Sequence, residues 1–127
     1  MSIYGIGSDI IDISRIKKAL KNKNFKQKIF SNKEIKFVEA KANKIAGYAK
    51  KFAAKEAFSK ALGTGISEGI SFRDISINND KRGRPFITLL GKTKLNVDQI
   101  LKKKYKIFVS ISDEKKYALA TVIITSL

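Results

Sequence analysis

Apolar and polar positions alternate with a period of two in five stretches of the chain, and this alternation is typical of β-strands. Turn-rich segments, NDKRGR and DEKK, separate two pairs of these stretches, so we expect two hairpins. Pro85, the only proline, enters the second strand of the first hairpin. The five stretches are IYGIGSDIIDI (3–13), SFRDISIN (71–78), PFITLL (85–90), YKIFVSIS (105–112) and YALATVIIT (117–125).

Three further stretches carry the apolar spacing or the capping residues of short helices. SRIKKALKN, at residues 14–22, is the first, and either Asp12 or Ser14 can cap its amino end. SNKE, at residues 31–34, has the spacing of a capping box and opens the next helix. KTKLNVDQILKKK, at residues 92–104, is amphipathic and follows the first hairpin.

The longest helix is expected from Lys44 to Leu62. Gly63 is placed to end this helix in the left-handed conformation. One broad face of the helix carries small and apolar side chains, which allow close packing against a sheet: Ala53, Ala54, Ala57, Phe58, Ala61 and Leu62.

In chain order these elements read β-α-α-α-β-β-α-β-β, with the helices grouped between hairpin-like pairs of strands. This arrangement is typical of the α+β class, with a mostly antiparallel sheet and helices packed on one face. The 127 residues contain no linker, no shift of composition and no solenoid-like repeat. We therefore expect a single domain over residues 1–127.

The composition is strongly basic, with 27 Lys and Arg against 11 Asp and Glu and a net charge of +16. An acidic partner is expected, and nucleic acid is one candidate. However, the lysines are not interleaved with aromatic side chains, and arginine, which base recognition favours, is rare. Part of the charge is equally explained by mutational bias in the source genome. The arginines are Arg15, Arg73, Arg82 and Arg84.

Cysteine and histidine are both absent. This excludes disulfides, thiol nucleophiles, histidine general bases and the usual zinc sites, so the chemistry must use carboxylates, lysines, hydroxyls or water. MSIYGIG lacks the basic segment of a signal peptide, and the apolar runs are far shorter than the about 20 residues of a membrane span. We expect a soluble, cytoplasmic protein without a membrane partner.

Two acids stand out by their surroundings. Glu56 lies opposite the alanine-rich face, one turn before Lys60, and a solvated Glu–Lys pair explains it. Asp9 interrupts an apolar face of the first strand, although aspartate is depleted in strands. It could accept structural hydrogen bonds, pair with a lysine, or bind a hard cation together with Glu56. Mg²⁺ commonly takes one or two protein carboxylates and completes its shell with water and phosphate oxygens. Spacing alone does not choose among these alternatives.

GTGI, at residues 63–66, could bind a phosphate through its backbone amides. It follows a helix instead of opening one, and it lacks the GxxxxGK[ST] pattern of a P-loop. A helix C-cap explains the same glycines.

Two segments together resemble the signature motifs of the holo-acyl-carrier-protein synthases, a family of small phosphopantetheinyl transferases. GIGSDIIDISRI (5–16) is similar to the family's G-[IL]-G-x-D-[IL] opening, and FAAKEAFSKALGTGI (52–66) to its F-x-x-K-E-A-x-x-K-A-x-G-T-G block. NDKRGRPFITL and VSISDEKKYALATVI resemble its asparagine-rich turn before G-[KR]-P and its closing hairpin. The resemblance covers nearly the whole chain and implies a 4′-phosphopantetheinyl transferase-like fold.

The resemblance implies transfer of 4′-phosphopantetheine from coenzyme A to a serine of apo-acyl carrier protein, with release of adenosine 3′,5′-bisphosphate, in fatty acid biosynthesis. It also implies Mg²⁺ as the cofactor and a homotrimer with active sites between neighbouring subunits. An acidic carrier protein and a polyanionic coenzyme then account for the positive charge, and nucleic acid is not a partner. The contrasting hypothesis is a basic nucleic-acid-binding module in which Asp9 and Glu56 are structural.

By position in the motifs, Asp9 and Glu56 correspond to the family's metal carboxylates, and Lys60 matches the lysine that faces the phosphates. These three residues form the expected catalytic set. Arg15 lies where the family has a basic residue on the helix that meets the carrier protein, and the same predicted helix carries Lys17, Lys18 and Lys21. The expected coenzyme A-binding residues are Lys60, Gly63, Thr64, Gly65 and Pro85.

Asp113 departs from the family pattern. It ends the VSIS strand where many members have a histidine near the nucleotide, so a role in catalysis or adenine contact is not carried over to it. The proton of the attacking serine would pass to Glu56, to a metal-bound water supported by Asp9, or to a phosphate oxygen of coenzyme A. The sequence does not choose among these acceptors.

Overall fold

The computed structural model describes residues 1–64 and 69–127, and it confirms the α+β class and the expected order of strands and helices. Within these ranges two helices are additional to those expected, α2 and a short 3₁₀ helix at Phe72–Asp74, where the sequence predicted the beginning of a strand. No helix there has both the length and the hydrophobicity to cross a bilayer. The elements are β1 (Ser2–Asp12), α1 (Ile13–Ala19), α2 (Lys23–Ile29), α3 (Asn32–Glu39), α4 (Lys44–Leu62), the 3₁₀ helix η1 (Phe72–Asp74), β2 (Ile75–Asn79), β3 (Pro85–Leu89), α5 (Gly91–Leu101), β4 (Tyr105–Asp113) and β5 (Tyr117–Ser126).

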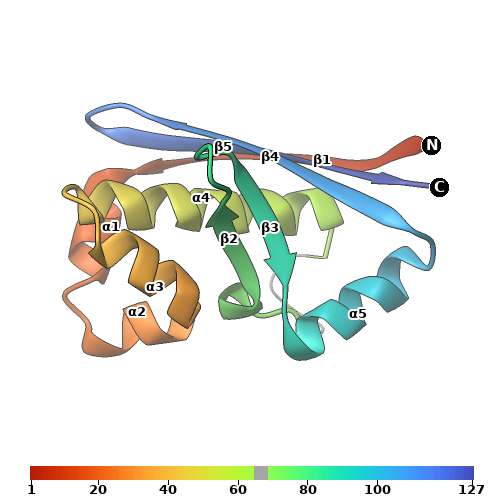
Figure 1. Ribbon diagram of the computed structural model, residues 1–127, viewed down its shortest axis with the longest axis horizontal. Coiled ribbons are helices and arrows are strands. Elements are labelled where there is room, and N and C mark those ends of the chain that lie inside the picture. The colour runs from red at the N-terminus through yellow and green to blue at the C-terminus, as the bar shows by residue number, and fades with distance from the viewer. Residues whose placement is uncertain (65–68) are drawn as a thin grey trace.

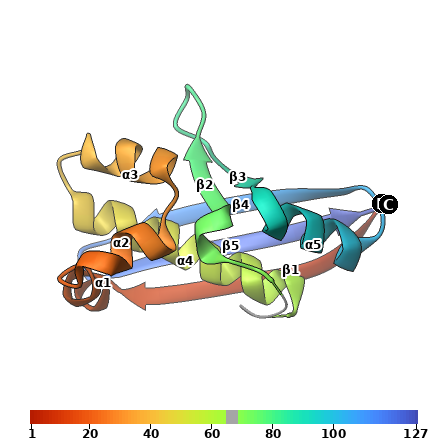
Figure 2. The same cartoon turned by 90° about the horizontal axis from the view of Figure 1, so that it is seen from below.

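The strands form two antiparallel sheets. One sheet has the strand order β1-β5-β4, and the other is the hairpin of β2 and β3. Figure 1 shows the three-stranded sheet as one layer, with the helices on the same side of it. β1 pairs with β5 from Ser2 opposite Ser126 to Asp12 opposite Tyr117. The first and last strands therefore lie side by side, and Figure 2 shows the two termini at the same end of the molecule.

α4 is the centre of the core and packs under the three-stranded sheet against β1 and β5 (Figure 1). Its alanine-rich face is buried, as its sequence pattern predicts. A Cβ atom added to Gly5 would lie 1.9 Å from the carbonyl oxygen of Ala61, and one added to Gly7 would lie 2.1 Å from that of Ala57. Only glycine allows β1 to approach the α4 backbone this closely. The same approach brings Asp9, two residues after Gly7, next to the helix.

The ends of the helices follow the capping residues that the sequence shows. The Asp12 carboxylate accepts a hydrogen bond from the Ser14 amide at 2.9 Å and caps α1. Ser31 and Glu34 form the expected capping box of α3. Gly63 ends α4 with φ +90°, and its amide donates to the Ser59 carbonyl at 3.0 Å. The helix C-cap explanation of Gly63 is therefore confirmed.

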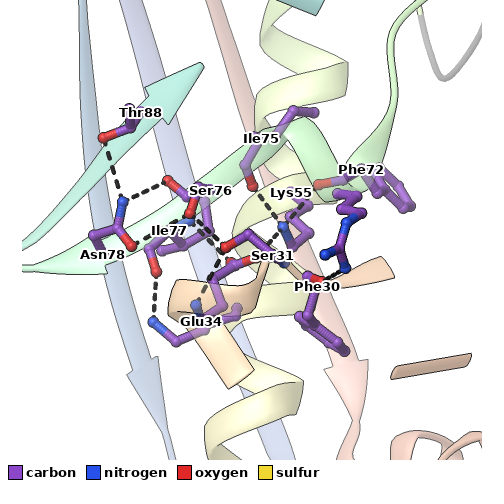
Figure 3. Close-up of polar contacts among 12 residues, drawn as sticks. Phe30, Ser31, Glu34, Lys55, Phe72, Ile75, Ser76, Ile77, Asn78 and Thr88 are labelled. Carbon is purple, nitrogen blue, oxygen red and sulfur yellow. Dashed lines mark hydrogen bonds and ion pairs between the residues drawn. The ribbon is translucent and has the colours of Figure 1, made fainter. Parts of the chain in front are cut away.

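Lys55 joins α4 to the β2–β3 hairpin from a fully buried position (Figure 3). Its ammonium donates to Glu34 Oε1 of α3 at 2.7 Å and to the carbonyl oxygens of Phe72 at 2.7 Å and Ile75 at 2.5 Å. These three acceptors, one of which is the negatively charged Glu34 carboxylate, offset the desolvation cost of burying the ammonium.

Lys51 and Glu34 continue this contact along β2. Lys51 Nζ donates to the Ile77 carbonyl oxygen at 2.6 Å, and the Ile77 amide donates to Glu34 Oε2 at 2.9 Å. In an antiparallel pair, alternate residues bond to the partner strand. The backbone groups of Ile75 and Ile77 point away from β3 and bind the side chains of Lys51, Lys55 and Glu34 instead. These three side chains occupy the position that a neighbouring strand would take. The position of the hairpin along α4 is thereby fixed.

Candidate functional site

Asp9 and Lys60 face each other across the junction of β1 and α4. Lys60 Nζ lies 3.2 Å from Asp9 Oδ1 and donates to the Ser8 carbonyl oxygen at 2.9 Å. The Asp9 side chain is 16% exposed and that of Lys60 is 55% exposed. The carboxylate is therefore sheltered, whereas the lysine reaches it from the surface. The structure brings together two residues that the sequence places in separate motifs.

Glu56 lies one turn before Lys60 on α4 and is partly buried. Its pKa is raised above the usual 4.5, first because burial disfavours the charged carboxylate and second because Asp9 repels it, with Lys60 partly offsetting both. Across residues 1–64 and 69–127 no hydrogen bond or ion pair reaches its carboxylate. The Glu56–Lys60 pair considered from the sequence is not formed, because Lys60 binds Asp9 instead.

Asp9, Glu56 and Lys60 together bring two negative charges and one positive charge to one place. The unpaired, partly buried Glu56 carboxylate is a group that a further cation would neutralise, and oxygen donors of this kind suit Mg²⁺. In the described ranges no cluster of three or more His, Cys, Asp or Glu could hold a metal ion. Two carboxylates could hold a cation only together with ligands from water or from a substrate.

The carboxyl end of α4 lies one turn beyond Lys60. Gly63 occupies it in the left-handed conformation, and Thr64 follows in a partly buried position. Gly65 falls outside the described residues. Binding of a phosphate by the GTGI turn therefore stays a prediction.

Pro85 and Asp113 lie at a different place from the carboxylate pair. Both line a pocket of about 440 Å³ between the start of α4, the tip of the β2–β3 hairpin and the end of β4, and its lining residues do not include Asp9, Glu56 or Lys60. The Asp113 carboxylate lies 3.8 Å from Lys50 Nζ. Within one chain, the predicted coenzyme-binding residues are thus divided between two places.

Arg15 lies on α1 with its side chain exposed, next to the exposed Lys17 and Lys18. Lys21 was expected on the same helix. It lies beyond it, because α1 ends at Ala19. The basic surface of α1 is therefore shorter than the sequence predicts.

Sequence reasoning did not single out the buried charges Glu34, Lys51 and Lys55. Burial lowers the pKa of Lys51 to about 8, and it lowers the pKa of Lys55 to about 8 against the opposing effect of Glu34. A signal was present in the spacing. Lys51 precedes Phe58 by seven positions, and Lys55 precedes Leu62 by seven. Since seven residues are about two helical turns, each lysine lies at the margin of the buried apolar face.

Comparison with known proteins gives consistent matches over nearly the whole chain. Residues 5–122 match the family model described as the 4′-phosphopantetheinyl transferase superfamily. The holo-[acyl-carrier-protein] synthase of Pelagibacter ubique is 50% identical over 98% of this chain and 98% of its own length. The crystal structure of the corresponding synthase from Neisseria meningitidis superposes with a TM-score of 0.88 at 35% identity, covering 98% of this chain and 99% of that chain. The Helicobacter pylori synthase, solved in complex with coenzyme A, gives a TM-score of 0.82 at 35% identity, covering 94% and 99%.

Proposed function

Because this chain belongs to the 4′-phosphopantetheinyl transferase superfamily, as one of its holo-[acyl-carrier-protein] synthases, we propose that it transfers 4′-phosphopantetheine from coenzyme A to a serine of apo-acyl carrier protein, with Mg²⁺ as cofactor. One observation carries the proposal. Asp9 of β1 meets Lys60 of α4 at 3.2 Å, beside the unpaired Glu56. A role in fatty acid biosynthesis and a cytoplasmic location are further inferences that rest on the sequence.

In the proposed reaction the serine oxygen forms a bond to the phosphorus of the pantetheine phosphate, while the bond from that phosphorus to the oxygen of adenosine 3′,5′-bisphosphate breaks. The serine proton passes to Glu56, to a water beside Asp9 or to a phosphate oxygen of coenzyme A. Asp9 and Glu56 would hold Mg²⁺, which supplies positive charge to the diphosphate when bound. Lys60 would stabilise negative charge on the departing phosphate, because its long, exposed stem can carry the ammonium beyond Asp9. Gly63, Thr64 and Gly65 would border the coenzyme at the end of α4.

The proposed enzyme is a homotrimer. Several large apolar side chains are exposed on the face of the three-stranded sheet away from the helices. In the strand register, Ile6 and Phe108 both lie opposite Ile123, and Ile10 lies opposite Leu119. Ser8, Thr121 and Ser110 lie between these two groups, so the patch is apolar on either side of one row of small hydroxyl side chains. A patch of this kind is typical of a protein–protein interface. A second and a third copy of the chain would bury it.

The division of the predicted residues between two places also supports this assembly. Pro85 lines a pocket apart from Asp9, Glu56 and Lys60 within one chain. If each active site lies between neighbouring subunits, the hairpin turn of one subunit would meet the carboxylate pair of the next.

Replacing an apolar residue of this sheet face tests the assembly. Ile6 and Leu95 are both 63% exposed, but Leu95 lies on α5 and outside the patch. We expect Ile6→Lys to produce a monomer in sedimentation analysis, because it buries a charge in the proposed interface. Leu95→Lys should remain trimeric. A trimer of unchanged stability in Ile6→Lys would show that this face is not the interface.

The transfer itself is tested by mass spectrometry of apo-acyl carrier protein incubated with the purified protein, coenzyme A and Mg²⁺. The expected product is heavier by one 4′-phosphopantetheine group, and it should not form with Asp9→Asn or without Mg²⁺. No mass gain with the unaltered protein would overturn the proposal. If the protein instead bound DNA tightly at low salt and released it at high salt, that result would favour the nucleic-acid-binding hypothesis.

A further inference from the structure

Lys60 binds the oxygens that a cation at Asp9 would also use. Its ammonium contacts Asp9 Oδ1 at 3.2 Å and the Ser8 carbonyl oxygen at 2.9 Å. A carboxylate and a backbone carbonyl are both ligands that hard cations accept. The same lysine is expected to bind the phosphates of coenzyme A. The contact of the ammonium with Asp9 therefore weakens as the ammonium moves toward the phosphates.

We propose that Lys60 competes with the divalent cation for Asp9, and that the phosphates of coenzyme A resolve the competition by drawing Lys60 away. Binding of the cation and binding of the coenzyme are then coupled through this one side chain. The inference rests on the proposed function, because it takes coenzyme A and a divalent cation as the ligands of the site.

The charges at the site determine the sign of the coupling. With Lys60 on Asp9, the group of Asp9, Glu56 and Lys60 carries a net charge of −1, and with Lys60 withdrawn the two carboxylates present −2. A dication is attracted more strongly to the second arrangement. A polyanion that attracts Lys60 therefore strengthens cation binding, and by thermodynamic linkage the cation strengthens coenzyme binding to the same degree.

Lys60 is suited to this exchange because its side chain is 55% exposed and its ion pair lies at the surface, where such pairs are weak. Its stem is long and flexible, so the ammonium can reach a second acceptor without movement of α4. Lys55, one turn and a residue earlier, shows the contrasting case. It is fully buried and held by three acceptors, so it cannot exchange partners.

The test measures cation affinity directly, with Mn²⁺ as the probe in the absence of coenzyme A. Mn²⁺ binding to the free protein is followed by electron paramagnetic resonance of the unbound ion. We expect Lys60→Gln to bind Mn²⁺ about tenfold more tightly than the unaltered protein, because a unit positive charge a few ångströms from a dication is removed. Lys60→Arg keeps the charge and should bind Mn²⁺ as weakly as the unaltered protein.

Lys44→Gln is the matched control. Lys44 also lies on α4, is 52% exposed and pairs with a carboxylate, that of Glu39, at 3.4 Å. It begins the helix, about 24 Å from Lys60 at 1.5 Å per residue, so its loss should leave Mn²⁺ affinity nearly unchanged. An equal gain in Lys44→Gln and Lys60→Gln would mean that overall charge alone acts, and it would overturn the inference.

Calorimetry provides the second arm. The affinity for coenzyme A is measured with and without Mg²⁺, and the strengthening caused by Mg²⁺ should be severalfold smaller in Lys60→Gln than in the unaltered protein. The inference is overturned if a folded Lys60→Gln variant binds Mn²⁺ no more tightly than the unaltered protein and Mg²⁺ strengthens its coenzyme binding as before. This result would leave the transferase proposal intact. Failure of the transferase proposal shows separately, as the absence of a mass gain on the carrier protein.

Discussion

The Glu56 carboxylate lowers the free energy of unfolding at neutral pH, and it is also a proposed ligand of the cation. Its folded-state pKa is raised, so at pH 7 the folded state holds the charged carboxylate less favourably than the unfolded state does. We expect Glu56→Gln, which keeps the volume and removes the charge, to raise the thermal midpoint at pH 7 without divalent cations. The same change should lower the transfer rate about 100-fold or more.

Glu114→Gln provides the comparison for this prediction, because Glu114 lies exposed in the turn between β4 and β5. It should leave both the midpoint and the rate unchanged. A less stable Glu56→Gln variant, or one with full activity, would show that the Glu56 carboxylate is a structural group.

Lys51 makes the stability of the protein depend on pH in the alkaline range. Burial lowers its pKa to about 8 from 10.5, so between these values the unfolded state binds more protons than the folded state. Stability therefore rises with pH through this window. Relative to Lys51→Met, the unaltered protein should gain about 1–2 kcal/mol between pH 7.5 and 9.5, from at most 1.36 kcal/mol per pH unit. Urea unfolding of both proteins at the two pH values measures the difference, and parallel curves would contradict it.

The contact between α3, α4 and β2 rests on the fully buried pair of Glu34 and Lys55 (Figure 3). We expect Glu34→Gln or Lys55→Met alone to cost about 3–5 kcal/mol, because either change leaves an unpaired buried charge. The double variant should recover about 1–3 kcal/mol of the summed cost. Chemical denaturation of the four proteins gives this cycle.

The exposed pair of Lys94 and Asp98 on α5 serves as the control for that cycle, since its ammonium lies 2.6 Å from the carboxylate but in solvent. Lys94→Met should cost at most about 1 kcal/mol. Strictly additive costs in the Glu34 and Lys55 cycle would mean that the two charges stabilise the hairpin independently.

Elements with a long pattern or a clear cap could be predicted from the sequence. α4 begins and ends where its apolar face and Gly63 indicate, and α3 begins at its capping box. α2 was not assigned, because its seven residues are too few to show a helical period and none of them is fully buried. The spacing places Lys51 and Lys55 only at the margin of the buried face, because their burial depends on carbonyl acceptors of β2 that lie 26 and 20 residues further along the chain.

The residues of the candidate site differ in how clearly the sequence marks them. Asp9 stands out locally as an acid on an apolar strand face, whereas Glu56 is unremarkable on the polar side of its helix. From the residues alone, joint cation binding by Asp9 and Glu56 is one alternative among several, and the resemblance to a family is what favours it. Their proximity depends on the approach of β1 to α4 at Gly5 and Gly7, which spacing along the chain does not reveal.

Across the whole molecule, the net charge of +16 favours encounter with acidic partners, and we expect α1 to be where the carrier protein docks. Arg15→Glu should raise the KM for carrier protein severalfold at low salt, through repulsion of an acidic partner, and the effect should shrink as salt approaches about 0.15 M and above. Coenzyme affinity, measured by calorimetry with Mg²⁺, should not change. Steady-state kinetics at several salt concentrations measures the KM.

Lys103→Glu makes the same change of charge at the other end of the molecule, in the connection between α5 and β4 (Figure 1). It should raise the KM for carrier protein much less than Arg15→Glu does. An unaltered KM at low salt in Arg15→Glu would place the docking surface elsewhere.

The pairing of β1 with β5 also governs when the protein can fold. Asp9 lies opposite Ala120 in this pairing, so the strand that carries it gains its neighbour only after nearly the whole described chain has been synthesised. Closing so long a loop costs conformational entropy and makes folding slow relative to that of chains with local contacts. On the ribosome, β1 therefore remains without its partner strand until β5 has been synthesised.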